Sequence, residues 1–504
     1  MMMEKLVSRR SYLRHPLTAI GAAILLASFL AFLTLVLVDM TSHGENPYRS
    51  LITFVAIPSV GLFGLVLFLF GIWWQIRKRR KTGEEVKFTL NFNPSDPRYV
   101  RNIWTFIGVA ILFVVLSSFI GYKAYESTDS PQFCGEFCHT VMAPQRVTYK
   151  NSAHARVPCV ECHIGEGASY LVRAKIDGIR QLWATATNSY TRPTKTPVHN
   201  LRPAQETCES CHWPRQFYGQ KLLTRTYYRT NKENTPWSID LLMKIGGGNP
   251  RTGIMEGIHW HMAASNKIEY IATDEKRHDI IWVRSTTPEG EETVYTRGNN
   301  IDPTSDTLNV RRFDCMDCHN RPSHKFLPPA TAINLALSTR NISPELPYIR
   351  KEGLKLLNAE YQTDAEARDS IAIKLSRYYE EEFPEIFAER PELIKQAVYY
   401  LQTTYSENFF PEMKTDYRVR ENHLSHFVND GCFRCHDGEM RNEFGEYLQT
   451  DCQTCHLIVA QGPSEDINEL EANIAGLDFR HPEDIDGMWK EMKCTECHTP
   501  DDGY

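Results

Sequence analysis

The sequence predicts a mainly α membrane-anchored protein, in which three transmembrane helices precede a large domain with sparse secondary structure and a small β insertion. Three observations lead to this fold class. Three long apolar segments lie near the N-terminus, all 14 cysteines fall into pairs that are followed by histidine, and one later stretch alternates as strands do. At 504 residues the chain is too long for one compact core, so we expect more than one folding unit.

The three apolar segments are residues 17–38, 51–74 and 103–122. Each is uncharged and about as long as the ~20 residues that a helix needs to cross the hydrocarbon layer. The first could instead be a cleaved signal peptide, because the twin-arginine-like Ser8-Arg9-Arg10 precedes it. Its apolar run is too long for a signal core and no small-x-small cleavage site follows before Asp39, so an uncleaved anchor is favoured. We therefore predict a three-helix membrane anchor over residues 1–122.

Basic residues near these segments predict the orientation, because positively charged loops stay on the cytoplasmic side. The N-terminus carries four basic residues and the loop after the second segment carries five, Arg77 to Lys81, whereas the loop 39–50 has only Arg49. The N-terminus and the loop 75–102 are then cytoplasmic. Residues 123–504 consequently lie on the other side of the membrane.

All 14 cysteines belong to seven motifs in which histidine directly follows the second cysteine. Two thioether bonds would fix a porphyrin edge, and the adjacent histidine would bind the iron from one face. Zinc knuckles, the alternative, need further Cys or His at finger spacing. We therefore predict seven covalently bound haem c groups, at sites one to seven in chain order. The cysteines are Cys134 and Cys138, Cys159 and Cys162, Cys208 and Cys211, Cys315 and Cys318, Cys432 and Cys435, Cys452 and Cys455, and Cys494 and Cys497. The histidines are His139, His163, His212, His319, His436, His456 and His498.

The first motif has three residues between its cysteines instead of two. Gly135 would let the loop accommodate the extra residue. The alternative is a Cys134–Cys138 disulfide with six haems in total, but His139 directly after the second cysteine favours haem. Covalent haem attachment in bacteria occurs on the outer side of the membrane. We therefore expect a multi-pass protein of the bacterial inner (cytoplasmic) membrane with its haem domain in the periplasm.

Each iron needs a second axial ligand unless it is to bind substrate. Met142, three residues after His139, is a candidate at site one, and the histidines outside the motifs exceed the six further ligands required. The count therefore predicts six-coordinate haems that transfer electrons, and it permits an open haem. The histidine candidates are His154, His199, His259, His261, His324, His423, His426 and His481.

Two details separate these histidines. His259 and His261 flank Trp260 in a predicted strand, where they would point to opposite faces, so we expect only one of them to reach an iron. His278 lies in a charged turn and is expected to be a bystander.

The rest of the chain divides by composition. Residues 213–312 are rich in Gly, Thr and aromatic residues, and Lys267 to Arg297 alternates as a β-hairpin would, with Pro288-Glu289-Gly290 at its turn. Residues 330–428 show helical apolar spacing and predict a connector of two to four helices. We expect a four-haem domain over 123–329 that contains the β insertion, and a three-haem region over 429–504.

From Pro131 to Pro329 the sequence resembles the NapC/NirT family of membrane-anchored quinol dehydrogenases. The resemblance rests on Cys-His-Thr-Val-Met at 138–142, His154 before the second motif, and Ser-His-Lys-Phe-Leu-Pro at 323–328. It implies menaquinol as the electron source and Met142 as the ligand of haem one. It also implies His154, His259 or His261, and His324 as ligands of other irons among the first four. Family members have four haems and usually one span, so the additional spans and haems depart from that pattern.

In this family the quinol pocket lies beside haem one and uses a lysine on the helix after motif two, with an acidic residue nearby. The corresponding helix would run from about 168 to 187, where apolar residues stand four positions before and after Lys175. Lys175 is therefore the site candidate, and a lysine that only snorkels at the membrane surface is the alternative. Gln181 stands where relatives carry the acidic residue, which leaves Asp177 as a substitute proton acceptor.

These features together predict a mainly α membrane-anchored multihaem cytochrome c that oxidises menaquinol and passes electrons to periplasmic multihaem c-type cytochromes. The alternative is a membrane anchor and electron-donor subunit of a periplasmic nitrite or other oxyanion reductase complex. No motif ends in Cys-x-x-Cys-Lys, the usual nitrite-reductase signature. A net charge of −6 provides no basic excess for nucleic acid. The oligomeric state is left open, a homo-oligomer included.

Overall fold

The computed structural model divides into two compact units, Met1–Cys134 with Cys159–Arg180, and Gly135–Pro158 with Gln181–Tyr504. Each unit is described by itself. The described residues are 16–41, 52, 56–82, 97, 100–101, 104–105, 108, 119, 123, 127, 129–137, 139–164, 168–196, 203–213, 219–246, 257–263, 266–298, 301–305, 308–424 and 426–501.

The first unit contains two long helices, α1 (Pro16–Thr41) and α3 (Ile57–Thr82). Within the described ranges, Pro16–Leu35 is the one stretch long and apolar enough to cross a membrane, and the apolar part of α3 is shorter, Ser59–Gln75. The third predicted span, 103–122, lies largely outside the described residues. The structure thus supports one of the three predicted spans by length and composition.

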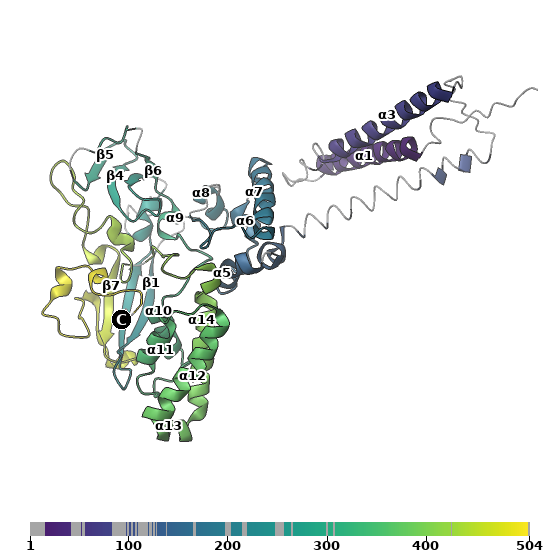
Figure 1. Cartoon of the computed structure of the whole chain (residues 1–504). Coiled ribbons are helices and arrows are strands. Elements are labelled where there is room, and N and C mark those ends of the chain that lie inside the picture. The colour runs from purple at the N-terminus through teal and green to yellow at the C-terminus, as the bar shows by residue number, and fades with distance from the viewer. Residues whose placement is uncertain are drawn as a thin grey trace, which may run out of the picture. The chain divides into compact units, whose positions relative to one another are not determined.

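Helices α1 and α3 pack closely because glycines line their contact (Figure 1). A Cβ added to Gly71 would lie 2.6 Å from Thr18 Oγ1, and one added to Gly64 would lie 2.7 Å from Ile24 Cγ2. Gln75 Nε2 donates a buried hydrogen bond of 3.0 Å to Thr18 Oγ1. Small residues that admit a close backbone approach, together with a polar bond between helices, are typical of membrane helix pairs.

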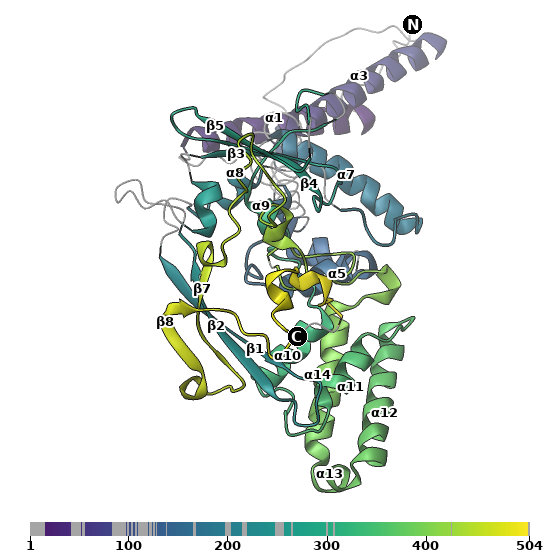
Figure 2. The ribbon, with the colours of Figure 1, turned by 90° about the vertical axis from the view of Figure 1, so that its left-hand side faces the viewer.

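The second unit contains an antiparallel sheet whose strands come from two distant parts of the chain. Its order is β1-β2-β7-β8, and Figure 2 shows these strands as one twisted sheet. Ser238 pairs with Thr226 on one side and with Gly462 on the other. The predicted insertion and the predicted C-terminal region therefore share a sheet, and the structure places no boundary between them. The strands are β1 (Gln220–Tyr228), β2 (Pro236–Lys244), β7 (His456–Gly462) and β8 (Glu471–Leu477).

The second sheet contains the predicted hairpin. Its order is β5-β4-β3-β6, and β4 and β5 pair antiparallel across residues 287–291. Gly290 has a φ of +88°, which glycine adopts without strain, and its amide bonds to Thr287 O at 3.0 Å. The hairpin turn at Pro288 is thus confirmed, and a further turn at 273–279 adds a third strand. The strands are β3 (Lys267–Ala272), β4 (Ile280–Thr286), β5 (Glu292–Thr296) and β6 (Arg311–Arg312).

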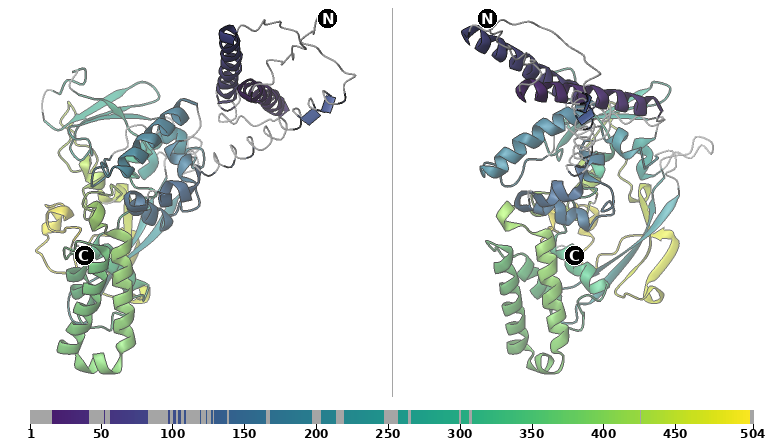
Figure 3. Two further views of the ribbon diagram at one scale, coloured as in Figure 1. Left: turned by 45° about the vertical axis from the view of Figure 1, so that its right-hand side comes forward. Right: turned by 90° about the vertical axis from the view of Figure 1, so that its right-hand side faces the viewer.

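Five helices fill the connector, one more than the expected maximum. Pro384 and Pro391 each begin a new helix, because proline suits the first helical turn but interrupts a helix interior. Leu337, Ile371 and Leu401 are among the fully buried side chains of this bundle. Figure 3 shows α12 and α14 side by side with α13 joining their ends. The helices are α10 (Pro329–Ser338), α11 (Ile349–Leu357), α12 (Asp364–Glu382), α13 (Pro384–Glu389) and α14 (Pro391–Asn408).

The cysteine motifs lie on short helical turns, whereas the two four-stranded sheets and the helical connector give this unit more regular structure than the expected sparse domain with a small β insertion. The α-helical elements are α5 (His139–Lys150), α6 (Cys159–His163), α7 (Ala168–Ala186), α8 (Ala204–Cys208) and α9 (Cys315–Cys318). The π- and 3₁₀-helical elements are η3 (Phe133–Phe137), η5 (Ile258–Met262), η6 (Pro411–Met413), η7 (Gly431–Arg434), η8 (Cys452–Thr454), η9 (Ile467–Glu469), η10 (Met488–Lys490) and η11 (Cys494–Glu496).

Candidate haem-binding sites

Several motifs share one local geometry, a single turn that brings the histidine back over the first cysteine. The amide of His212 bonds to Cys208 O, and the amides of His319 and His498 bond to the carbonyls of the cysteines four residues earlier, each at 2.8 Å. The first cysteine and the histidine are therefore one helical turn apart, on the same face. This is the arrangement that a porphyrin bonded at its edge and ligated at its centre requires.

The first motif uses a different turn. Its first cysteine lies in the π-helix η3, whose wider turn holds an additional residue, which suits a three-residue spacing. Gly135 is buried here, and a Cβ would lie 2.5 Å from Arg146 Cδ, a side chain that forms an ion pair with Glu136. A larger residue at this position would have to displace the Arg146 side chain. Cys138 and the side chain of His139 lie outside the described residues.

Five motif histidines each face a second histidine at the separation of two axial ligands. The ring centres of these pairs are 5.9 to 6.3 Å apart. Two imidazoles that bind one iron from opposite faces have centres about 6 Å apart, because each bond to the metal is about 2 Å and the ring centre lies about 1 Å beyond the nitrogen. The pairs are His212 with His154, His319 with His259, His436 with His261, His456 with His426, and His498 with His481.

Hydrogen bonds at the Nδ1 atoms of these histidines agree with iron ligation through Nε2. His259 Nδ1 lies 2.7 Å from Ile245 O, and the Nδ1 atoms of His154, His261 and His436 also lie within 3.2 Å of backbone carbonyls. A carbonyl can only accept, so Nδ1 carries the proton and Nε2 is left as the unprotonated, metal-binding nitrogen. The Nδ1 atoms of His426 and His456 are buried and lack a hydrogen-bond partner in this structure. The donor set therefore fits haem.

His259 and His261 lie on the 3₁₀-helix η5, so the predicted strand is wrong. Gly257 precedes this turn with a φ of +105°, and a Cβ there would lie 2.5 Å from Gly246 O. In the tighter turn the two rings diverge without pointing to opposite faces of a sheet. Each faces a different motif histidine, whereas the strand pattern predicts that only one reaches an iron.

His278 and His423 form a pair that contains no motif histidine. Their ring centres are 5.5 Å apart, and His278 Nε2 binds Glu421 at 2.7 Å. This hydrogen bond raises the pKa of His278, while burial lowers the pKa of His423 to about 4. Glu421 thus holds His278, and the expectation that His278 binds no iron stays a prediction. His423, a predicted ligand candidate, lies against His278 and is not included in the ligand set proposed below.

The remaining histidine candidates are His324 and His199. His324 Nδ1 lies 3.0 Å from Gln145 O on α5, the helix that also carries Met142. This contact leaves the Nε2 of His324 as the nitrogen for a metal. His163 belongs to the first unit, and His199 lies outside the described residues.

Helix α7 coincides with the helix predicted to carry the quinol site. Asp177 and Arg180 form an ion pair of 3.4 Å, and Gln181 is exposed. Ile179 and Trp183 are 70% and 71% exposed, so one side of the helix presents large apolar side chains to the surroundings. Such a face suits lipid or an apolar ligand. The side chain of Lys175 lies outside the described part of the chain.

Consecutive motifs lie beside one another. Burial raises the pKa of the Cys318 thiol to about 12, and the neighbouring Cys432 contributes to the rise. A hydrogen bond with Cys208 lowers the pKa of the Cys315 thiol. The interacting cysteines join site three to four, four to five, five to six and six to seven; they are Cys208 with Cys315, Cys318 with Cys432, Cys432 with Cys455, and Cys452 with Cys494.

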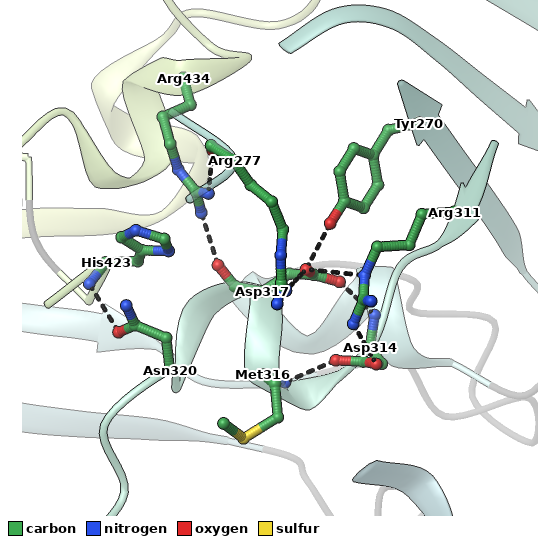
Figure 4. A network of polar contacts seen from close by, with 9 residues as sticks. All are labelled: Tyr270, Arg277, Arg311, Asp314, Met316, Asp317, Asn320, His423 and Arg434. Carbon is green, nitrogen blue, oxygen red and sulfur yellow. Dashed lines mark hydrogen bonds and ion pairs between the residues drawn. The ribbon is translucent and has the colours of Figure 1, made fainter. Parts of the chain in front are cut away.

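Sequence reasoning missed a group of charged residues inside two motifs. Asp317 and Arg434 occupy the variable positions between the cysteines of sites four and five, and both are buried. Glu136, Glu161, Glu209 and Glu496 are also charged residues between paired cysteines, so no sequence signal distinguishes Asp317 and Arg434. Figure 4 shows Arg434 reaching the backbone of Asp317, whose carboxylate contacts Tyr270 and Arg277.

Comparison with known proteins agrees with these features. Residues 97–207 match the model of the NapC/NirT cytochrome c family, N-terminal region. The chain is 38% identical over 491 residues to the cytochrome c-type protein ImcH of Geobacter sulfurreducens, which covers 97% of this chain and 95% of that protein. It is also 38% identical over 105 residues to NrfH of Wolinella succinogenes, covering 20% of this chain and 57% of NrfH. No solved structure matches the chain significantly. The chain therefore belongs to the NapC/NirT family of membrane-anchored c-type cytochromes, which transfer electrons through covalently bound haem.

Proposed function

We propose that this chain is a heptahaem menaquinol dehydrogenase that delivers electrons to periplasmic multihaem cytochromes. The carrying observation is that five motif histidines each face another histidine at 5.9 to 6.3 Å, the spacing of two axial ligands. Sites whose two axial positions are both filled by protein leave no coordination position for a substrate. Electron transfer is therefore favoured over reductase chemistry at these five sites.

The ligand set completes the proposal at the remaining sites. His139 and Met142 would hold site one, His163 would be the motif ligand of site two, and His324 would ligate another of the first four irons, as the family resemblance implies. Haem iron, once bound, alternates between the ferric and ferrous states and so carries one electron. The cysteines would fix each porphyrin edge, and the paired histidines would occupy both axial positions of the iron.

Quinol would bind beside site one at the apolar face of α7. The ammonium group of Lys175 would hydrogen-bond a quinol oxygen and stabilise the anion that forms as the first proton leaves. Each quinol releases two protons and two electrons, and the electrons leave singly along the sites. Asp177 and Gln181 would line the path by which the protons depart. The exposed Ile179 and Trp183 support this position, because they give the helix an apolar surface next to lipid.

The proposal includes three transmembrane helices with the haem domain in the periplasm. Helix α1 and the apolar part of α3, which pack closely, would be the first two spans, and residues 103–122 would be the third. The basic cluster from Arg77 to Lys81 at the end of α3 supports a cytoplasmic position for the loop that follows.

A single substitution tests the quinol site. Lys175→Met keeps the length of the side chain but removes its charge, so haem content should remain at seven by mass spectrometry. We expect haem reduction by menaquinol to slow at least about tenfold, equivalent to ~1.4 kcal/mol of barrier, while dithionite reduction is unchanged. Arg173→Met, at an exposed position of the same helix, is the control.

Equal rates in the two variants would refute the function proposed for Lys175. A wild-type chain with six haems would show that the first motif is empty. Stable co-purification of a catalytic subunit, with no quinol oxidation by the isolated chain, would support the alternative of an anchor for a reductase.

A further inference from the structure

The 3₁₀-helix η5 lies between sites four and five. Its two histidines are only two residues apart, so their Cα atoms are at most about 7 Å apart. His259 stacks toward His319 of site four, and His261 faces His436 of site five. One short turn therefore contributes to two successive sites. Its role as a double ligand rests on the haem binding proposed above.

The two pairs differ in the angle between their rings. The planes of His259 and His319 are 4° apart, whereas the planes of His261 and His436 are 85° apart. Parallel ligand planes split the iron d orbitals strongly and give a rhombic low-spin electron paramagnetic resonance (EPR) signal. Perpendicular planes leave the orbitals nearly degenerate and give a highly anisotropic signal. The two sites should thus be distinguishable in one spectrum.

A second connection joins the attachment loops themselves (Figure 4). Arg434, inside the motif of site five, donates from Nη2 to the backbone carbonyl of Asp317, inside the motif of site four, at 2.5 Å. Its Nη1 bonds to Arg277 O and its Nε to Gly431 O, each at 2.8 Å. The whole guanidinium is therefore used to hold three backbone carbonyls. The planar fork of arginine suits this task better than the single ammonium of lysine.

The attachment loop of site four is held as firmly as that of site five. The Asp317 carboxylate accepts from Tyr270 Oη and from Arg277 Nη1, both at 2.6 Å, and from the amide of Asp314 at 2.7 Å. Asp317 is 1% exposed, so these bonds satisfy a charge that water does not reach. Arg277 also ties Asp317 to Arg434, because it donates to the first and accepts from the second.

We propose that sites four and five form a fixed junction, in which His259 and His261 ligate two different irons and Arg434 is the positioning residue that holds the two attachment loops together. The junction connects the part of the chain that resembles four-haem relatives to the C-terminal haems. Electrons that enter at site one would pass through it to reach sites five to seven.

The ligand assignment is tested by EPR on the oxidised full-length protein in detergent. Methionine can still ligate iron, so His259→Met and His261→Met should keep seven haems by mass. We expect His259→Met to remove a rhombic signal of one haem and His261→Met to remove a highly anisotropic signal of one haem. Loss of the same signal in both variants, or no change in either one, would refute the inference that this turn supplies ligands to two irons. Fewer than seven haems in the wild type would instead count against the proposed function.

The positioning role is tested by rapid-mixing kinetics after electrons are supplied by menaquinol. Arg434→Met should leave the first phase of haem reduction unchanged and slow the later phase roughly tenfold or more, because small misplacements of redox partners are costly. Arg434→Lys should recover part of the rate. Arg390→Met, which removes an exposed arginine that pairs with Glu345 in the helical connector, is the control and should behave as wild type.

Two further readouts keep this test decisive. Low-spin signals of sites four and five should change shape in Arg434→Met with the haem count still seven. If Arg434→Met and Arg390→Met give the same later phase and the same spectrum, Arg434 does not position the junction. If Arg434→Met does not fold, the test uses Arg434→Lys. A folded Arg434→Lys with the kinetics and spectrum of the wild type would equally refute the positioning role.

Discussion

Asn234 provides a measure of how firmly the first sheet is attached to the helical connector. It is fully buried in the turn between β1 and β2, with a φ of +47°. Its Nδ2 donates to Pro344 O at 2.9 Å and to Leu346 O at 2.8 Å, and its Oδ1 accepts from the amide of Arg350 at 3.1 Å. One side chain thus satisfies three backbone groups of the segment that leads into α11.

The loss on substitution can be worked out from these contacts. Asn234→Ala removes three hydrogen bonds at about 1 kcal/mol each and replaces asparagine, which tolerates the left-handed region, with alanine, which does not, at about 1 kcal/mol. We therefore expect about 4 kcal/mol of destabilisation. Asn234→Gly tolerates the backbone conformation and should cost about 3 kcal/mol. Asn188→Ala is the matched control, because Asn188 also has a positive φ but is exposed, and it should cost about 1 kcal/mol.

The assay is urea denaturation of the detergent-solubilised protein, followed through the low-spin haem absorbance. The sheet carries His456 at the start of β7, so loss of the turn should be visible as loss of histidine ligation. A midpoint for Asn234→Ala equal to that of Asn188→Ala would refute the reasoning. So would equal midpoints for wild type and Asn234→Gly, because the three bonds would then contribute nothing.

Two other predictions concern local contacts. Glu421 raises the pKa of His278, so their ion pair stabilises the fold below the ordinary histidine pKa. This contribution disappears as pH rises through the raised pKa. His278→Gln should therefore lower the denaturation midpoint at pH 6 and have little effect on it at pH 9. Gly135→Ala should displace Arg146 and reduce occupancy of site one, which mass spectrometry would show as a six-haem species, whereas Gly178→Ala, with nothing within 4 Å of its Cβ, should keep seven haems.

Sequence patterns were sufficient wherever the determinant is local. The Cys and His spacing of each motif, the turn at Pro288 and the helix that carries Lys175 all depend on residues within a few turns of one another. The pairing of His259 and His261 with two different motifs was not predictable, because it depends on the close approach of Gly257 to Gly246 and on the tertiary position of η5. The alternation around Trp260 pointed to a strand, and tertiary packing overrode it.

The shared sheet was missed for a related reason. Strands β1 and β2 are an ordinary hairpin in the sequence, and β7 is a short apolar run that could pair with many partners. No local signal indicates that β7 adds to the edge of β2. Asp317 and Arg434 were missed because the positions between paired cysteines carry varied residues in the other motifs, and only their burial reveals their contacts.

The β2–β7 pairing also constrains how the protein can be made. Ser238 meets Gly462 only after roughly 220 further residues have been added, a highly non-local contact. At ordinary synthesis rates β2 waits on the order of 10–40 s for its partner. During this interval the hairpin of β1 and β2 has an unpaired edge at β2, while the motifs between β2 and β7 are synthesised in turn. Haem attachment to the earlier motifs can accordingly proceed on an unfinished chain, and closure of the sheet becomes a late step that follows synthesis of the sixth motif and can precede that of the seventh.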